Sequence, residues 1–291
     1  MERKYSKISP TAVFCARMRA KQNVPFAKEI IKLVDTKYSD FAEDIPDYGD
    51  TLTSKSDFIP FIEGRYYSLN EVLENIKNAL IIEIASGLSP RSLEFLNKSD
   101  TTYVDTELKG MIALKEKIVK EIVKKEKLPS SNLFFIPINP LNKKDMDKLG
   151  KFYLKNGKNK ILIIVHEGLL MYFNRMEKES FRENIKYLFE KYAKNGLWLT
   201  SDFSRLKNKS KEQKGKENIR DKISKVTNRQ FDYFESENET IKFLNSGGFK
   251  TEIISNEKVV NSIIKSKSLQ FNKKQILESA KGYRVWKSEL I

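Results

Sequence analysis

The chain has 291 residues, 40% of them hydrophobic, so it can bury a sizeable core in one large α/β domain or two smaller ones. Its formal net charge is +15, but the lysines are scattered and accompany abundant Asn and Ile. Broad lysine enrichment is the simpler explanation of this charge. Attraction of an acidic substrate is the alternative, and the charge alone does not decide between them. No RNA-recognition signature, zinc finger or basic zipper is present, so nucleic acid is not the expected partner.

Other classes of protein are excluded by simple counts. One cysteine, Cys15, rules out an internal disulfide framework and a cysteine-rich zinc site, and we expect no metal. No apolar run approaches the roughly 20 residues of a membrane helix. The first residues, MERKYSKISP, lack the apolar stretch of a signal peptide. We therefore expect a cytoplasmic protein without membrane contacts.

The first part of the chain, residues 1–78, is expected to form a helical cap. Ser9 and Pro10 open "SPTAVFCARMRAKQ" as a helix cap and first helical residue. "PFAKEIIKLVDTKY" and "SLNEVLENIKNA" have helical apolar spacing, whereas "DIPDYGDTLTSKSDFIPF" is typical of a loop.

Strands and helices then alternate, which predicts an α/β fold with a parallel sheet and helices on both faces. The expected strands lie at 79–86, 101–107, 132–138, 160–167, 196–203, 250–255 and 282–290, and the expected helices between them at 111–127, 181–193 and 238–249. We predict a single domain over 1–291, comprising the cap, a core at 79–203, an insertion or lid at 204–235, and the rest of the core at 236–291.

Residues at the ends of the strands matter most, because ligands of such sheets lie beyond the carboxyl ends of the strands. Ala85-Ser86-Gly87 is a small-residue turn after the first strand, although an ordinary turn would look the same. It matches neither GxGxxG nor a Walker loop. Asp105, about 20 residues later, is placed as a ribose-binding acid would be, or as a helix cap.

The stretch "ILIIVHEGLLMYF" places Glu167 directly after a strongly apolar strand. Burying a carboxylate there costs several kcal/mol unless it has a partner. His166 is the only histidine. Adjacent strand residues point to opposite faces, so if Glu167 faces a ligand, His166 is expected to have a structural role.

Five motifs together resemble the leucine carboxyl methyltransferase family, including its bacterial branch related to the tetracenomycin polyketide O-methyltransferase. They are "SPTAVFCARMRA", "GRYYSLNEVLENI", "IIEIASGLSPRS", "TTYVDTEL" and "IIVHEGLLMYF", and the resemblance spans roughly 9–250. It implies a class I methyltransferase dependent on S-adenosylmethionine (SAM). It also implies a Rossmann-like seven-stranded sheet with six parallel strands and a last antiparallel one.

The resemblance implies specific contacts with SAM. Arg65 would bind the methionine carboxylate, an anion that suits a guanidinium fork. The turn from Ala85 through Ser86 to Gly87 would lie against the methionine moiety, and Asp105 would bind the ribose. Glu167 would lie near the ammonium and sulfonium groups, with an ordinary salt bridge as the alternative.

Other positions match the family less closely. Its Gly-x-Gly turn is Ala85-Ser86-Gly87 here, and the acid expected near the adenine is missing from "INPLNKKD". Leu141 remains there, and Asn139 would replace the acid. Arg19, rather than Arg17, would touch the cofactor carboxylate or an acidic substrate, or else pair within the cap. Tyr172 would line the acceptor pocket or pack in the core.

We therefore expect transfer of a methyl group to a carboxylate or acidic hydroxyl of a small, anionic molecule, with S-adenosylhomocysteine as the product. A carboxylate acceptor needs no base, whereas a phenol or alcohol does. One alternative is methylation of a protein's C-terminal carboxylate. Another is a degenerate methyltransferase fold that binds nucleic acid. A nicotinamide-dependent oxidoreductase is disfavoured because GxGxxG is missing.

Overall fold

The computed structural model describes residues 9–21, 24–39, 58–203, 224–225, 227–254 and 284–291. Its centre is a seven-stranded sheet in the order β3-β2-β1-β4-β5-β7-β6. The strands are β1 Ala79–Ile84, β2 Thr102–Glu107, β3 Leu133–Pro137, β4 Ile161–His166, β5 Leu197–Thr200, β6 Phe249–Ile254 and β7 Val285–Leu290. All seven strands expected from the sequence are present, with ends that differ by a few residues.

Strand direction distinguishes this sheet from other doubly wound sheets. Strands β1 to β5 pair in parallel, whereas β7 runs antiparallel to both β5 and β6. The expected Rossmann-like seven-stranded sheet, with six parallel strands and one antiparallel strand, is confirmed.

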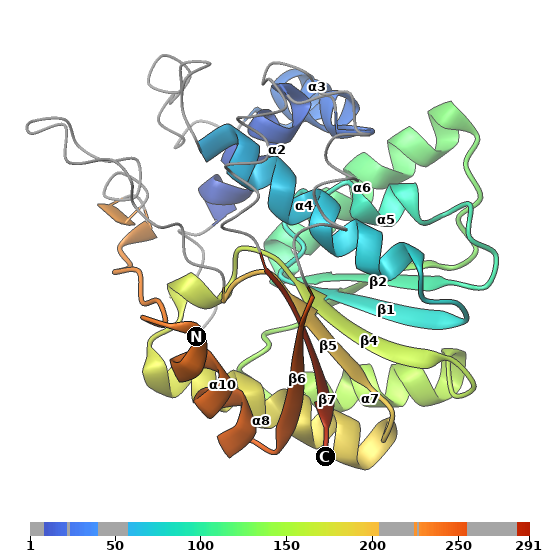
Figure 1. Cartoon of the computed structure of the whole chain (residues 1–291). Helices are drawn as coiled ribbons and strands as arrows, with labels where there is room; N and C mark the ends of the chain where they lie inside the picture. The colour runs from blue at the N-terminus through green and yellow to red at the C-terminus, as the bar shows by residue number, and fades with distance from the viewer. Residues whose placement is uncertain (1–8, 22–23, 40–57, 204–223, 226, 255–283) are drawn as a thin grey trace, which may run out of the picture.

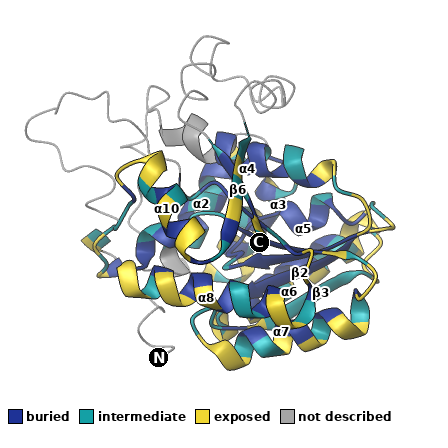
Figure 2. Cartoon of the chain, turned by 60° about the horizontal axis from the view of Figure 1, so that its bottom comes forward, coloured by how far each residue is buried: buried dark blue, intermediate teal, exposed yellow. Residues whose placement is uncertain are grey.

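The middle of the sheet is buried on both faces, which explains its continuous apolar sequence. Every residue of β1 is buried, and so are all residues of β4 after Ile161. Figure 2 shows dark blue, buried strands in the middle of the molecule, with exposed yellow positions along α7 and α8.

Helices cover the two faces of the sheet (Figure 1). On one face lie α2 Ser9–Lys21, α3 Ala27–Lys37, α4 Phe58–Glu74, α5 Arg91–Glu94 and α6 Lys109–Glu126. On the other lie α7 Lys143–Asn156, α8 Arg175–Tyr192 and α10 Glu237–Ser246. A hydrophobic core lies on each face of the sheet, and alternate residues of β1 pack into one or the other. Leu80 packs in the core under α7 and α8, and Ile81 packs in the core under α4.

Helix α7 was not expected from the sequence. Its segment is rich in lysine and contains Gly150, which weakens a helical pattern. A Cβ atom at Gly150 would lie only 2.1 Å from the Tyr192 ring, so the glycine lets α7 and α8 pack closely. The helix is held at its start by Asn142, whose side chain accepts a hydrogen bond from the Lys144 amide.

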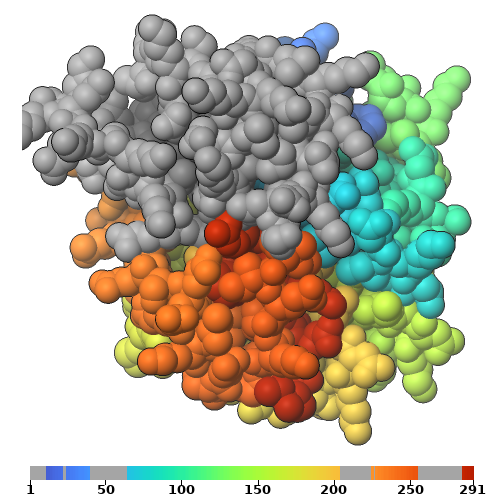
Figure 3. All heavy atoms as spheres, viewed as in Figure 1, coloured from blue at the N-terminus to red at the C-terminus, as the bar shows by residue number. Residues whose placement is uncertain are grey.

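Helix α4 also differs from expectation, because it begins at Phe58, inside the expected loop, and so carries Arg65. The expected lid at 204–235 lies largely outside the described residues. The last described elements lie side by side at the surface, α10 and β6 in orange and β7 in red (Figure 3). Among the described helices, none has the length and apolar character needed to cross a membrane.

Candidate functional site

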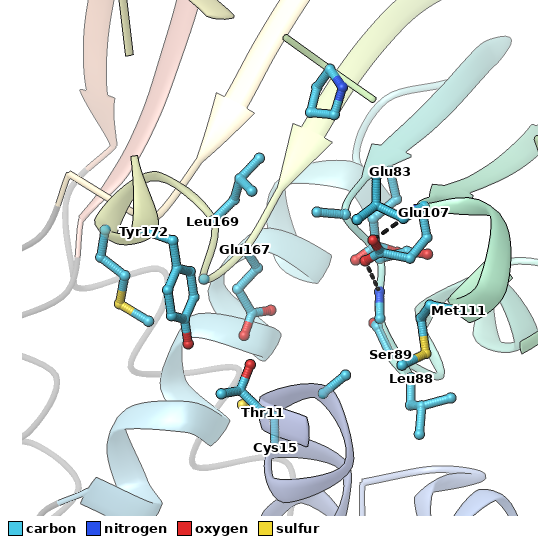
Figure 4. A pocket seen from close by; sticks show the side chains of 18 of the residues that line it. Thr11, Cys15, Glu83, Leu88, Ser89, Glu107, Met111, Glu167, Leu169 and Tyr172 are labelled. Carbon is cyan, nitrogen blue, oxygen red and sulfur yellow. Dashed lines mark hydrogen bonds between the residues drawn. The ribbon is translucent and has the colours of Figure 1, made fainter. Parts of the chain in front are cut away.

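A pocket lies beyond the carboxyl ends of β1, β2 and β4, and residues of α2 and α4 close it on the cap side. Its volume is about 1000 Å³, including the part open to solvent, which suits a nucleotide-sized ligand. Figure 4 shows two groups of side chains on opposite sides of it. One group has Leu88, Ser89, Glu107 and Met111. The other group, which we call the tyrosine end, has Thr11, Cys15 and Tyr172.

The turn after β1 brings backbone close to the pocket. Ala85 and Gly87 both have left-handed backbone angles, with φ of 52° and 49°. For Ala85, which has a Cβ atom, this conformation costs about 1–2 kcal/mol. A Cβ atom at Gly87 would lie 3.0 Å from the Ala12 Cβ of the cap helix. The amide of Ser86 donates to the Thr106 carbonyl at 3.0 Å, which ties the turn to the end of β2.

Glu107 is the acidic residue at the end of β2, and it lines the pocket. Its carboxylate accepts hydrogen bonds from the amides of Gly87, at 3.3 Å, and Leu108, at 2.8 Å. Burial raises the pKa of Glu107, while these amides and the Lys115 charge act in the opposite direction. Glu107 was not among the residues expected from the sequence, although it stands two residues after Asp105 in the same motif.

Asp105 does not line the pocket, which corrects the position expected from the sequence. It lies inside β2, opposite Glu83 of β1 and Phe135 of β3. Its side chain is fully buried and accepts a hydrogen bond from Lys115 Nζ at 2.6 Å. Burial raises the pKa of Asp105, and Lys115 opposes that rise. Glu107 lies two residues further along β2 and points to the same face of the sheet as Asp105. Because Glu107 is the last residue of the strand, it reaches the pocket, whereas Asp105 does not.

The partners of Glu167 are arginines of this chain. Its carboxylate is 2% exposed and lies 2.8 Å from Arg19 Nη2, 3.4 Å from Arg65 Nη2 and 2.7 Å from Arg91 Nη2. Burial would raise the pKa of Glu167, but the three guanidinium groups lower it overall. Arg91 also donates to Glu83, so it joins the ends of β1 and β4. Because arginines hold both oxygens, Glu167 orients cations at the pocket wall.

Arg19 and Arg65 both line the pocket, from α2 and α4 respectively. The Arg19 side chain is 6% exposed, and its Nε has no hydrogen-bond partner among the described residues. Buried donors of this kind are normally satisfied. A ligand oxygen is therefore well suited to this position. Arg17, by contrast, pairs with Asp35 at 3.0 Å near the surface.

His166 has a structural position, as expected from strand alternation. Its ring is fully buried, and its Nε2 accepts from Trp198 Nε1 at 2.9 Å, so the proton lies on Nδ1. Nδ1 donates to Asp202 at 2.9 Å. Asp202 also accepts from the amides of Gly168, Leu169 and Leu170. These bonds hold the segment between Glu167 and Tyr172.

The tyrosine end contains polar groups that keep their protons. Burial raises the pKa of the Tyr172 hydroxyl, which shares a hydrogen bond with Thr11. Burial likewise raises the pKa of the Cys15 thiol, while Arg19 lowers it. The Tyr172 ring packs edge-on against Phe231, which lies near the end of the expected lid, at 5.3 Å between ring centres.

The loop after β3 contributes Asn139 but not Leu141. The Asn139 side chain accepts from the Leu141 amide at 3.0 Å, forming a tight turn. Leu141 instead packs against the hydrophobic core under α7 and α8. Of the expected ligand-binding residues, the structure thus gathers Arg19, Arg65, Ala85, Ser86, Gly87, Asn139, Glu167 and Tyr172 around one pocket. The described residues contain no group of three or more His, Cys, Asp or Glu side chains suited to a metal ion.

No family model and no curated protein matches the chain. One similar solved structure is human N-acetylserotonin methyltransferase in complex with SAM, with TM-score 0.46 and 9% identity, covering 90% of this chain and 70% of that one. An O-methyltransferase family protein from Burkholderia thailandensis has TM-score 0.47 and 9% identity, with coverages of 91% and 71%. Geranyl diphosphate C-methyltransferase from Streptomyces coelicolor A3(2) has TM-score 0.44 and 9% identity, with coverages of 77% and 78%.

Proposed function

We propose that the pocket binds SAM and that the protein transfers its methyl group to a small-molecule acceptor. The observation that carries this proposal is the position of Glu107. It ends β2 beside the turn after β1 and accepts a hydrogen bond from the Gly87 amide. In doubly wound sheets an acid at this place is the usual partner of ribose hydroxyls. The ribose role expected of Asp105 therefore passes to Glu107.

Arg19 and Arg65 together form what we call the cationic wall of the pocket. This wall supports the binding of an amino-acid carboxylate next to the nucleoside. Arg19 and Arg65 present guanidinium groups from two cap helices, and both lie within reach of one oxygen of Glu167. Glu167 fixes their orientation before a ligand arrives, which lowers the cost of ordering them on binding. The buried Nε of Arg19 would donate to the ligand carboxylate.

The tyrosine end is the proposed acceptor side. A bound sulfonium cofactor supplies an already activated methyl group, so the protein has to position the acceptor and exclude water. Tyr172 and Cys15 keep their protons, and three arginines hold Glu167 ionised, so these groups are poor bases. A carboxylate acceptor needs no base. This chemistry favours an anionic carboxylate or acidic hydroxyl, in line with the resemblance to leucine carboxyl methyltransferases.

Calorimetry with SAM and S-adenosylhomocysteine tests the proposal, with NADH as the control ligand. We expect micromolar binding of both sulfur nucleosides and none of NADH. Arg65→Ala should weaken binding of S-adenosylhomocysteine by about 1.5–3 kcal/mol, the usual cost of losing a charged hydrogen bond. Absence of binding at millimolar concentration would overturn the proposal and direct attention to nucleic acid as the ligand. Transfer of labelled methyl groups to candidate carboxylic acids, including peptides with free C-termini, then identifies the acceptor.

A further inference from the structure

Tyr66 is a buried aromatic residue directly behind the cationic wall of the pocket. It follows Arg65 in α4, and its side chain is fully buried. It is not among the residues that line the pocket. Any effect of Tyr66 on a ligand must therefore act through its neighbours.

Those neighbours include two of the arginines that hold Glu167. The guanidinium carbon of Arg19 lies 5.1 Å from the centre of the Tyr66 ring, and that of Arg91 lies 4.7 Å from it. Arg19 binds one oxygen of Glu167 and Arg91 binds the other. A single ring thus contacts one arginine at each of the two oxygens of the Glu167 carboxylate.

The ring itself is fixed in place. Its hydroxyl donates to Glu94 in α5. Asn70 donates to the same Glu94 oxygen at 3.4 Å and accepts from Arg91 Nε at 2.6 Å. Because α4 and α5 hold both the ring and Arg91, movement of the ring would disturb the guanidinium positions.

We infer that Tyr66 is a positioning residue, which holds Arg19 and Arg91 against Glu167 by cation–π contact. This inference rests on the proposed function. Contacts between a guanidinium and an aromatic face are strongest where water is excluded, as it is here. An arginine side chain also loses considerable rotamer entropy when it is ordered. Tyr66 orders these arginine side chains already in the folded protein, so that ligand binding does not have to order them.

The test varies the electrostatics of the ring at nearly constant size. Calorimetry with S-adenosylhomocysteine is carried out on wild type, Tyr66→Phe, and Tyr66 replaced by phenylalanine with one, two or three ring fluorines. Fluorine weakens the negative face of the ring without removing it. The reference for the fluorinated series is Tyr66→Phe, because every member of the series lacks the hydroxyl that donates to Glu94. Relative to Tyr66→Phe, we expect a stepwise loss of affinity of about fivefold to tenfold over the series. Tyr66→Leu, which removes the ring, should lose at least as much.

The matched control is Tyr153→Leu, which removes another buried tyrosine. Tyr153 lies in α7 on the opposite face of the sheet, and its hydroxyl donates to backbone carbonyls at 158 and 160. We expect Tyr153→Leu to lower thermal stability but to leave the affinity unchanged. Equal affinities across the fluorinated series would overturn the inference while the proposed function stands. If wild type itself binds neither SAM nor S-adenosylhomocysteine, the proposed function fails, and the inference fails with it.

Discussion

The carboxylate of Asp202 accepts a hydrogen bond from Nδ1 of His166, at 2.9 Å, and from each of the three backbone amides after Glu167. Two residues near the ends of neighbouring strands, β4 and β5, therefore fix the backbone between Glu167 and Tyr172. Gly168 begins this segment with φ of 75°, where a Cβ atom would lie 3.4 Å from Arg65 Nη2. Asp202 shapes the pocket without lining it.

Asp202→Asn should destabilise the protein by about 3 kcal/mol, because an amide nitrogen cannot accept the bonds that one carboxylate oxygen accepts now. Urea unfolding followed by the fluorescence of the two buried tryptophans, Trp198 and Trp286, measures this change. The matched control is Asp35→Asn. The Asp35 side chain is 46% exposed and pairs with Arg17, whose side chain is 31% exposed, so its loss should cost under about 1 kcal/mol. Equal costs for the two variants would contradict the structural role given to Asp202.

The same carboxylate predicts how stability depends on acid. Burial would raise the pKa of Asp202, but His166, Arg65 and the Leu170 amide lower it from 3.8 to about 2. A lowered pKa in the folded state means that the stabilisation is complete above about pH 4 and is lost as the pH falls towards 2. It amounts to about 2 kcal/mol. The stability difference between wild type and Asp202→Asn should therefore narrow by that amount in acid, and a constant difference would show that Asp202 does not titrate in this range.

For Glu94 we predict the opposite dependence of folding stability on pH. Burial is the largest influence on its pKa, which rises from 4.5 to about 6 although the Tyr66 hydrogen bond and Arg91 lower it. A raised pKa in the folded state favours the protonated form, so this contribution is present below pH 4.5 and is lost as the pH rises through 6. Glu94→Gln should accordingly be more stable than wild type above neutral pH, by at most about 2 kcal/mol. The two proteins should converge near pH 4.5, which thermal unfolding across this range can check.

Much of the fold could be predicted because it depends on local patterns. The apolar runs of β1 and β4 predicted buried parallel strands, and the alternation of strands with helices predicted the sheet. Helix α7 was not predicted from the sequence. Gly150 weakens its helical pattern, and the reason for this glycine is its close approach to Tyr192 of a partner helix, which no local pattern shows.

The site could be predicted only in part, because its charges meet across long stretches of chain. Ala85, Gly87 and Glu167 come after apolar strands and are visible as motifs. Arg91 and Arg19 reach Glu167 from 76 and 148 residues away, and the sequence does not record such pairing. Arg91 was not singled out from the sequence, although it is the first charged residue after the glycine turn.

Glu107 and Asp105 offer the sharpest comparison of a ligand-binding acid with a structural one. They are two residues apart on the same face of β2, but Glu107 lines the pocket while Asp105 pairs with buried Lys115. Glu107→Ala should weaken binding of S-adenosylhomocysteine by about 1.5–3 kcal/mol, and it should also cost about 1–3 kcal/mol of stability because the Gly87 and Leu108 amides lose their acceptor. Asp105→Asn should cost about 3 kcal/mol of stability, because Lys115 keeps a buried charge without its anion, while the folded protein retains its affinity. Calorimetry and urea unfolding on both variants separate these effects. If Asp105→Asn weakened binding more than Glu107→Ala did in fully folded samples, the ribose role would return to Asp105.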